Sequence, residues 1–221
     1  MATAKKRKKK NKIKIFPIIL VLIIVGGLFA WYHFDAIVKK AKDFNPSSFT
    51  YPTKYEEYVI KYSNKFDIDA RFVYAIINTE SHFDPNATSN VGARGLMQLM
   101  DEAYNWVKFR LDDTRKHTFD DMYDPELNIE YGTYMLKYLY DRYDGSYELT
   151  AAAYHGGMGA VDGWIEAGTV DPKNFKLEDV PSDVTANYIY KVTNAYNKYK
   201  HKLKDYDKTT NERNVENGQK K

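Results

Sequence analysis

Cysteine is absent from the 221-residue chain. Its absence excludes disulfide bonds, thiolate metal ligands, a cysteine nucleophile and a lipid-modified N-terminal cysteine. It does not identify a redox compartment, because an exported protein can fold without disulfides. Tyrosine is abundant, with 20 residues, and such side chains can fill a core or line a groove whose ligand has apolar and hydroxyl faces.

Acidic residues are missing from the first 14 positions, which hold eight lysines and arginines. The formal net charge of the whole chain is +3. Removing these eight from the 33 basic residues leaves 25 against 30 acidic residues, so the remainder carries −5. Because phosphate binding requires a basic surface, this acidic remainder argues against nucleic acid as a partner.

Charged residues are also missing from Ile15 to Phe34 when His33 is neutral. This run is about as long as a bilayer crossing requires, and Trp31 and Tyr32 stand where amphipathic rings favour the interface. It is long for a signal peptide, and no clear small-residue cleavage site follows, which favours an uncleaved anchor over a cleaved leader. We therefore expect a single-pass protein of the cell membrane, with a cytoplasmic N-terminus and the bulk of the chain outside.

The composition divides the chain into five segments. We predict a basic cytoplasmic segment (1–14), a transmembrane anchor (15–34), a stalk (35–50), a folded domain (51–203) and a disordered polar tail (204–221). No strand repeat or solenoid period is evident in the folded domain, where helical spacing dominates. The fold class is therefore mostly α.

The expected helices follow from apolar spacing and capping signals. They span 54–66, a segment capped by Asp69, a segment beginning within Gly95 to Met100, a long segment opened by Asp124-Pro125-Glu126, 149–154 with Gly156-Gly157 at its end, 159–167 and 184–199.

Glu80 stands on an apolar helical face. Val73, Ile76, Ile77 and Glu80 follow one another at i, i+3, i+4 and i+7, which places them on one side of a helix. Burying a charge there costs free energy unless it is paired or serves a purpose. The structural explanation is an ion pair with a cation such as Arg94, and the functional one is a carboxyl group that remains neutral.

Two further segments contain residues that suit ligand binding or catalysis, beyond what their helical spacing explains. In Gly92-Ala93-Arg94-Gly95-Leu96-Met97-Gln98 the glycines permit positive φ, Met97 offers an apolar wall, and the Gln98 amide suits sugar hydroxyls or an acetamido group. In Ala153-Tyr154-His155-Gly156-Gly157 the glycines again allow close backbone approach. Taken singly, each has a structural explanation: core packing for Met97 and Tyr154, an exposed loop for His155, and helix termination for the glycines.

In combination and in this order, the motifs resemble the lytic transglycosylase domain of the soluble transglycosylase type, which is related in fold to goose-type lysozyme. The matching positions are Glu80, Ser81, Phe83, Pro85, Ala87, Ser89, Gly92, Ala93, Gly95, Leu96, Met97 and Gln98, then Ala153, Tyr154 and Gly157. The segment from Asp124 to Ile129 looks like the family's middle helix, and Val161 and Trp164 follow at the expected offset. The resemblance covers about residues 55 to 200 and implies a lysozyme-like multi-helix domain with a substrate groove.

The resemblance also implies roles. Glu80 matches the catalytic acid, and Tyr188 a late tyrosine near it. The substrate-binding candidates are Ser81, Met97, Gln98, Tyr154, His155 and Tyr188. The chain departs from the family at three places: His155-Gly156-Gly157 for Asn-Ala-Gly, Val184 for a glutamate before threonine, and Asp101 for proline.

The implied activity is peptidoglycan lytic transglycosylation. Glu80 would protonate the β-1,4 glycosidic oxygen between N-acetylmuramic acid and N-acetylglucosamine, then act as a base on the 6-hydroxyl that closes a 1,6-anhydro ring. A carboxyl group can donate at neutral pH only when an apolar setting keeps it protonated. Because the nucleophile belongs to the substrate, a second carboxylate is unnecessary.

Two other functions stay open. A muramidase on the same fold would use water activated by another acid, such as Asp112 or Asp120. A non-catalytic peptidoglycan-binding or envelope-scaffold protein would keep the groove without turnover. The departures at His155 and Val184 favour that alternative, whereas the intact Glu80-Ser81 and Gly-Leu-Met-Gln motifs weigh against it.

We expect no cofactor and no metal site. The histidines lack the close spacing of a zinc helix, and the paired aspartates at 112–113 and 120–121 lack an EF-hand pattern. The expected partners are peptidoglycan strands and, through residues 15–34, the membrane.

Overall fold

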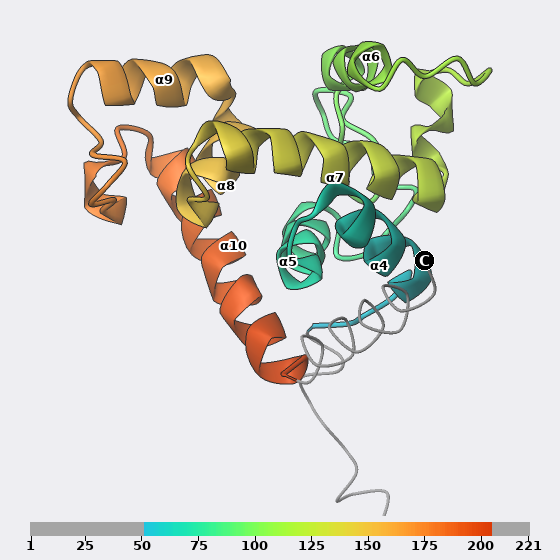
Figure 1. The fold of residues 1–221 in the computed structure, drawn as a ribbon, viewed down its shortest axis with the longest axis horizontal. Coiled ribbons are helices and arrows are strands. Elements are labelled where there is room, and N and C mark those ends of the chain that lie inside the picture. The colour runs from blue at the N-terminus through green and yellow to red at the C-terminus, as the bar shows by residue number, and fades with distance from the viewer. Residues whose placement is uncertain (1–50, 205–221) are drawn as a thin grey trace, which may run out of the picture. The chain divides into compact units, whose positions relative to one another are not determined.

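The computed structural model describes residues 51–204 (Figure 1). The predicted basic segment, the anchor at 15–34, the stalk and the tail from residue 205 onward lie outside the described residues. Between residues 51 and 204, no helix combines the length and the apolar character that a membrane crossing requires.

The described residues are mostly helical, as predicted. The helices are α4 (Glu56–Phe66), α5 (Ala70–Glu80), α6 (Asp101–Arg110), α7 (Pro125–Arg142), α8 (Tyr147–Gly156), α9 (Met158–Glu166) and α10 (Asp183–Lys202), with 3₁₀ turns η1 (Phe119–Tyr123) and η2 (Leu177–Asp179). In residues 51–204, β pairing is limited to isolated bridges, from Arg94 to Thr88 and to Leu99.

Side-chain caps start two of the helices where the sequence predicts them. The Asp69 carboxylate accepts a hydrogen bond from the Arg71 backbone N–H at 2.8 Å and begins α5. Asp124 accepts one from the Leu127 N–H at 2.8 Å, with Pro125 in the first turn of α7. Each carboxylate satisfies an N–H group that has no partner within its helix.

The prediction that a helix begins within Gly95 to Met100 is wrong. Gly95 and Gln98 have φ values of +74° and +49°, which a right-handed helix does not accommodate. Instead, Arg94 and Leu99 exchange backbone hydrogen bonds of 2.9 and 3.0 Å, and the segment folds into a tight loop. Helix α6 begins only at Asp101, after the loop has closed.

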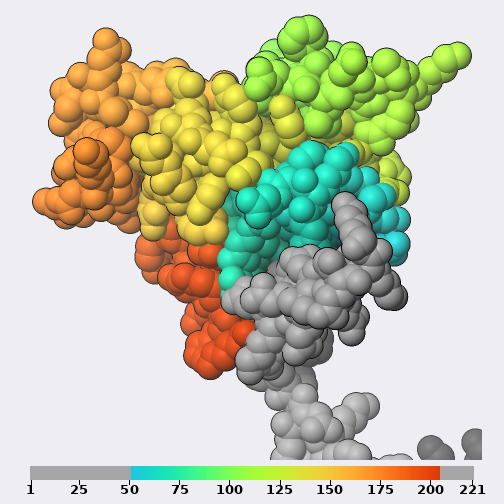
Figure 2. Space-filling view, viewed as in Figure 1, coloured from blue at the N-terminus to red at the C-terminus, as the bar shows by residue number. Residues whose placement is uncertain are grey.

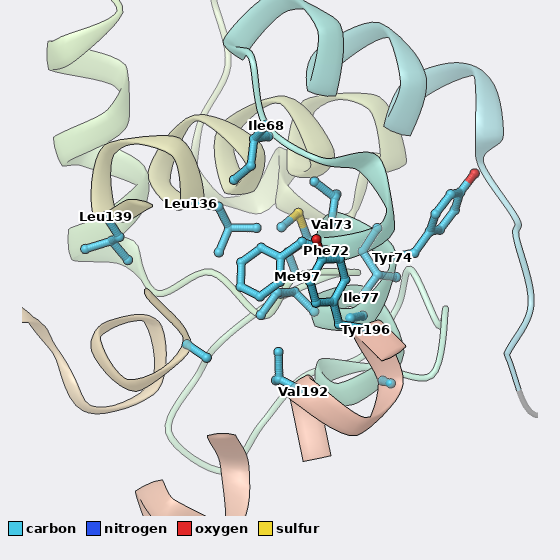
Figure 3. Packing of buried hydrophobic residues seen from close by; sticks show 14 of the residues in the cluster. Ile68, Phe72, Val73, Tyr74, Ile77, Met97, Leu136, Leu139, Val192 and Tyr196 are labelled. Carbon is cyan, nitrogen blue, oxygen red and sulfur yellow. The ribbon is translucent and has the colours of Figure 1, made fainter. Parts of the chain in front are cut away.

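The helices pack around α5 and α7. Helix α10 packs against α5 and α8, and α4 packs against α7 (Figure 1). In the space-filling view, the α6 segment and the α8–α9 segment stand at opposite ends of α7 (Figure 2). The main core gathers Phe72, Val73 and Ile77 of α5 with Met97 and Val192 (Figure 3).

A buried polar network attaches the loop after α6 to α7. The Asp113 carboxylate, with a side chain only 6% exposed, accepts hydrogen bonds from Tyr131 at 2.8 Å and from Arg115 at 2.5 Å, and its Oδ2 lies 3.1 Å from His117 Nε2. Arg115 also pairs with buried Glu130 at 2.7 Å. These charge-assisted contacts hold the pKa of Asp113 far below its ordinary range, with the Arg115 hydrogen bond as the main cause.

The same loop also holds α6 in place. The His117 carbonyl oxygen accepts hydrogen bonds from the Tyr104 hydroxyl and the Lys108 ammonium group of α6, both at 2.8 Å. Helix α6 is therefore linked to α7 through this loop as well as through the apolar cluster around Tyr104, Val107 and Tyr131.

We expect Asp113→Asn to lower the free energy of unfolding by about 1–2 kcal/mol at pH 7, because Arg115 loses a charged acceptor but stays half exposed to screening water. The folded pKa is depressed, so the wild-type advantage is present above the unfolded pKa of about 3.9 and is lost as pH falls below it. Urea denaturation at pH 7 and pH 3 measures the difference. The exposed neighbour variant Asp112→Asn is the control, and equal stabilities of Asp113→Asn and wild type at pH 7 would contradict the assignment.

Candidate active site

Glu80 is the last residue of α5 and lies half-buried beside an apolar face. Val73, Ile76 and Ile77 on that face are fully buried, as their spacing predicts. Burial raises the pKa of Glu80 to about 7, and a hydrogen bond from Tyr188 partly opposes the rise. The carboxyl group is therefore poised to exchange a proton near neutral pH.

Tyr188 brings α10 to Glu80. Its hydroxyl donates a hydrogen bond of 2.5 Å to Glu80 Oε1, and its side chain is buried at 7% exposure. Burial and the nearby Glu80 charge raise the pKa of Tyr188 well above its ordinary value, so the phenol keeps its proton. This confirms that Tyr188 lies beside the acid.

The structural explanation for Glu80, an ion pair with Arg94, is wrong. Arg94 instead pairs with Asp120 at 2.5 Å and lies over the Phe119 ring, 4.2 Å from its centroid. Among the causes that shift the pKa of Glu80, no neighbouring charge in residues 51–204 appears.

Tyr154 and Met97 form a second contact beside the acid. The Tyr154 hydroxyl donates to the Met97 carbonyl oxygen at 2.7 Å. Burial, and to a lesser extent the charge of Glu80, raises the pKa of Tyr154 well above its ordinary value. The Met97 side chain is fully buried in the core, with its sulfur close to Gly132 of α7 (Figure 3). The expected apolar wall at Met97 is therefore not exposed, and this residue offers its backbone instead.

Ser81 and Gln98 donate hydrogen bonds to backbone carbonyl oxygens in and near the loop at Gly95. The Ser81 hydroxyl donates to the Leu96 carbonyl oxygen at 2.7 Å. The Gln98 amide nitrogen donates to the carbonyl oxygens of Gly95 and Ala87 at 2.9 and 3.1 Å. Within residues 51–204 the Gln98 amide oxygen accepts no hydrogen bond, which leaves it available to an N–H donor.

His155 follows Tyr154 at the end of α8 and is exposed. Its ring stacks on Tyr188 with centroids 4.5 Å apart, and its Nδ1 lies 3.3 Å from the Thr185 hydroxyl. Burial of part of the ring lowers the pKa of His155 below its ordinary value. The residue is thus a stacked neighbour of the Tyr188–Glu80 pair rather than a free loop side chain.

Asn128 of α7 is a site-building residue that the sequence analysis did not single out. Its fully buried amide accepts from the Met97 N–H at 2.8 Å and donates to the Arg94 and Met122 carbonyl oxygens at 3.0 and 2.8 Å. A buried asparagine within a helix must find partners off its helix, and that signal could have pointed to it.

An apolar cavity of about 320 Å³ lies between α6, α7 and α9. Its lining includes Met100, Trp106, Met135, Tyr138 and Met158. Met100 follows Gln98 by two residues, and Met158 follows the glycine pair after His155, so two lining residues are close in the chain to segments of the site. Met100 lines this apolar cavity, whereas the Met97 side chain, expected from the sequence to form an apolar wall, is buried in the core.

The described residues offer little to a metal ion. No group of three or more histidine, cysteine, aspartate or glutamate side chains with suitable geometry occurs between residues 51 and 204.

Gly95 allows the loop to close, and we expect Gly95→Ala to destabilise it by about 3 kcal/mol. An added Cβ would lie 2.2 Å from the Met122 carbonyl oxygen and 2.4 Å from Asn128 Nδ2, at a φ that side chains rarely adopt. Thermal unfolding measures the loss. Gly159→Ala in α9, where no atom lies within 4 Å of the new Cβ, serves as the matched control. Equal melting temperatures of the two variants would contradict this role.

Comparison with known proteins identifies relatives of the chain. Residues 57–175 match the family model described as "Transglycosylase SLT domain". The chain is 35% identical over 153 residues to the soluble lytic murein transglycosylase of Salmonella typhimurium, covering 67% of this chain and 23% of that protein. It is 30% identical over 169 residues to the membrane-bound lytic murein transglycosylase C of Edwardsiella ictaluri, covering 66% and 46%.

A solved structure shares the fold. The 70 kDa soluble lytic transglycosylase of Escherichia coli superposes with a TM-score of 0.65 at 29% identity, over 69% of this chain and 25% of that one. The matched region is thus less than half of each of these relatives.

Proposed function

The chain belongs to the transglycosylase SLT domain family, and from that premise we propose that it is a peptidoglycan lytic transglycosylase with Glu80 as its catalytic residue. The observation that carries the proposal is the half-buried Glu80 carboxyl group, which has a pKa near 7 and accepts a hydrogen bond from Tyr188. A group of this pKa can give and take a proton at neutral pH.

Cleavage would use the Glu80 carboxyl group twice, first as an acid and then as a base. Glu80 donates its proton to the β-1,4 glycosidic oxygen as the bond to C1 of N-acetylmuramic acid breaks, and the Tyr188 hydroxyl stabilises the carboxylate that results. The carboxylate then removes the proton from the 6-hydroxyl of the same sugar, and that oxygen bonds to C1. The ring closes, Glu80 recovers its proton, and no water is consumed.

The other site residues would position the substrate. We propose that Gln98 Oε1 accepts the N–H of an acetamido group, that Ser81 and Tyr154 hold the loop in register with Glu80, and that the cavity at Met100 and Trp106 receives apolar sugar faces. Met97 would contribute indirectly, because its carbonyl oxygen accepts the hydrogen bond by which Tyr154 holds the loop.

The position of other acids favours the transglycosylase over a muramidase. Asp120 is bound by Arg94 and 85% exposed, and Asp112 is an exposed loop residue in a different cavity, beside Lys65 and Arg115. Neither contributes to the pKa of Glu80. Neither Asp112 nor Asp120 is therefore the base that a muramidase would need beside Glu80, whereas attack by the substrate hydroxyl needs no second carboxylate.

We further propose that residues 51–203 act outside the membrane, tethered by residues 15–34 with the N-terminus in the cytoplasm. The 20 uncharged residues behind eight cations support this arrangement. So does the similarity to a relative named as membrane-bound.

Glu80→Gln should reduce cleavage of purified peptidoglycan by at least about 10³-fold, because the amide can neither protonate the glycosidic oxygen nor take the proton from the 6-hydroxyl. Its thermal stability should stay close to that of wild type. Mass spectrometry of the wild-type digest should show 1,6-anhydro ends, lighter by one water than hydrolysed ends. Wild-type turnover in the Gln variant would refute the role of Glu80, and hydrated ends alone would establish the muramidase.

The pH profile should show activity lost as pH rises through about 7, because the protonated acid is the active form. Tyr188→Phe removes the donor that stabilises the Glu80 anion, so its alkaline limb should move upward by about one pH unit. Tyr190→Phe, at an exposed tyrosine of the same helix, is the control. A limb that moves downward in Tyr188→Phe would contradict the assigned hydrogen bond.

A further inference from the structure

The His155 side chain stacks on Tyr188, the residue that hydrogen-bonds to Glu80. Its ring lies 4.5 Å from the Tyr188 ring at an interplanar angle of 30°, a stacked arrangement. His155 itself is exposed, whereas Tyr188 beneath it is buried and hydrogen-bonded to Glu80. The imidazole therefore stands between solvent and one face of the Tyr188 ring, whose hydroxyl group bonds to Glu80.

A hydrogen-bond chain at the start of α10 fixes the imidazole. The Thr185 hydroxyl donates to Ser182 Oγ at 3.1 Å and lies 3.3 Å from His155 Nδ1. Because the Thr185 proton points to Ser182, the Thr185 oxygen is free to accept from Nδ1–H. Ser182 also caps α10 by accepting the Thr185 N–H at 3.2 Å. The ring orientation is thus tied to the helix that carries Tyr188.

The surroundings of His155 contain few titratable groups. From α10 it faces Tyr188, through which it is linked to Glu80 of α5, and its own helix supplies Tyr154. Burial lowers the pKa of His155, and no charged side chain of residues 51–204 contributes to that shift. Burial thus favours the neutral form of the ring, which is expected to act by its size and stacking rather than by its charge.

We propose that His155 is a positioning residue whose stacked ring shields the Tyr188–Glu80 pair from water and so keeps the Glu80 proton in place at neutral pH. The inference rests on the proposed function of Glu80 and extends it to a residue where the chain departs from the family resemblance, since asparagine has no ring to stack. It requires a ring at position 155, and it does not require an imidazole.

Two substitutions distinguish the contribution of the His155 ring from that of its nitrogen atoms. His155→Ala opens the face of Tyr188 to water, so the alkaline limb of kcat should move downward by about one pH unit. This is about a fivefold loss of activity at pH 7 when each protein is compared with its own plateau at lower pH. His155→Phe keeps a stacking ring, so its limb should stay near that of wild type. A purely structural role would instead lower activity equally at all pH values.

A limb that is unchanged in His155→Ala, or moved equally in both variants, would overturn the inference. A readout without turnover keeps it separate from the proposed function. Infrared difference spectra against Glu80→Gln follow the Glu80 carboxyl titration in the free protein, where the same order of pKa values is expected: Ala below Phe and wild type. If Glu80→Gln still cleaves peptidoglycan, the proposed function fails while this titration still decides the shielding by His155.

Discussion

The hydrogen bond from Tyr188 to Glu80 joins two helices whose contacting residues are 108 positions apart in the chain. It combines two opposing effects on one carboxyl group. Burial beside Val73, Ile76 and Ile77 disfavours the charged form, and the phenolic donor favours it. The balance leaves the pKa near 7, so that the two protonation states differ little in free energy at neutral pH. Proton donation and recovery by one residue both depend on that balance.

The rest of the site keeps this pair in register with a binding surface. Asn128 fixes the backbone from Arg94 to Met97, and Gly95 permits the close approach that this requires. Tyr154 then ties the end of α8 to the same loop through the Met97 carbonyl oxygen. The loop, α8 and α10 thus meet around the end of α5.

Much of this could be predicted from the sequence, because helical periodicity and caps are local signals. The apolar face ending at Glu80, the cap at Asp69 and the start of α7 at Asp124 all follow from neighbouring residues. The loop at Gly95 did not, because its conformation depends on Asn128, more than 30 residues away. The inward side chain of Met97 and the stacking of His155 on Tyr188 also depend on tertiary packing that spacing does not encode. The family resemblance nominated the candidate site residues, and the contacts in the structure distinguish those that hold the loop from those whose polar atoms are free of protein partners among the described residues.

The most direct test of this account is the pKa of Glu80 itself in the free wild-type protein. Carbon-13 NMR of glutamate-labelled protein, with the Glu80 signal assigned by its absence in Glu80→Gln, would follow the carboxyl group through a pH titration. The account predicts a midpoint near 7, well above the ordinary value of 4.5 for glutamate. A midpoint at the ordinary value would mean that the carboxyl group is ionised at neutral pH, and that it could not serve as the proton donor described here.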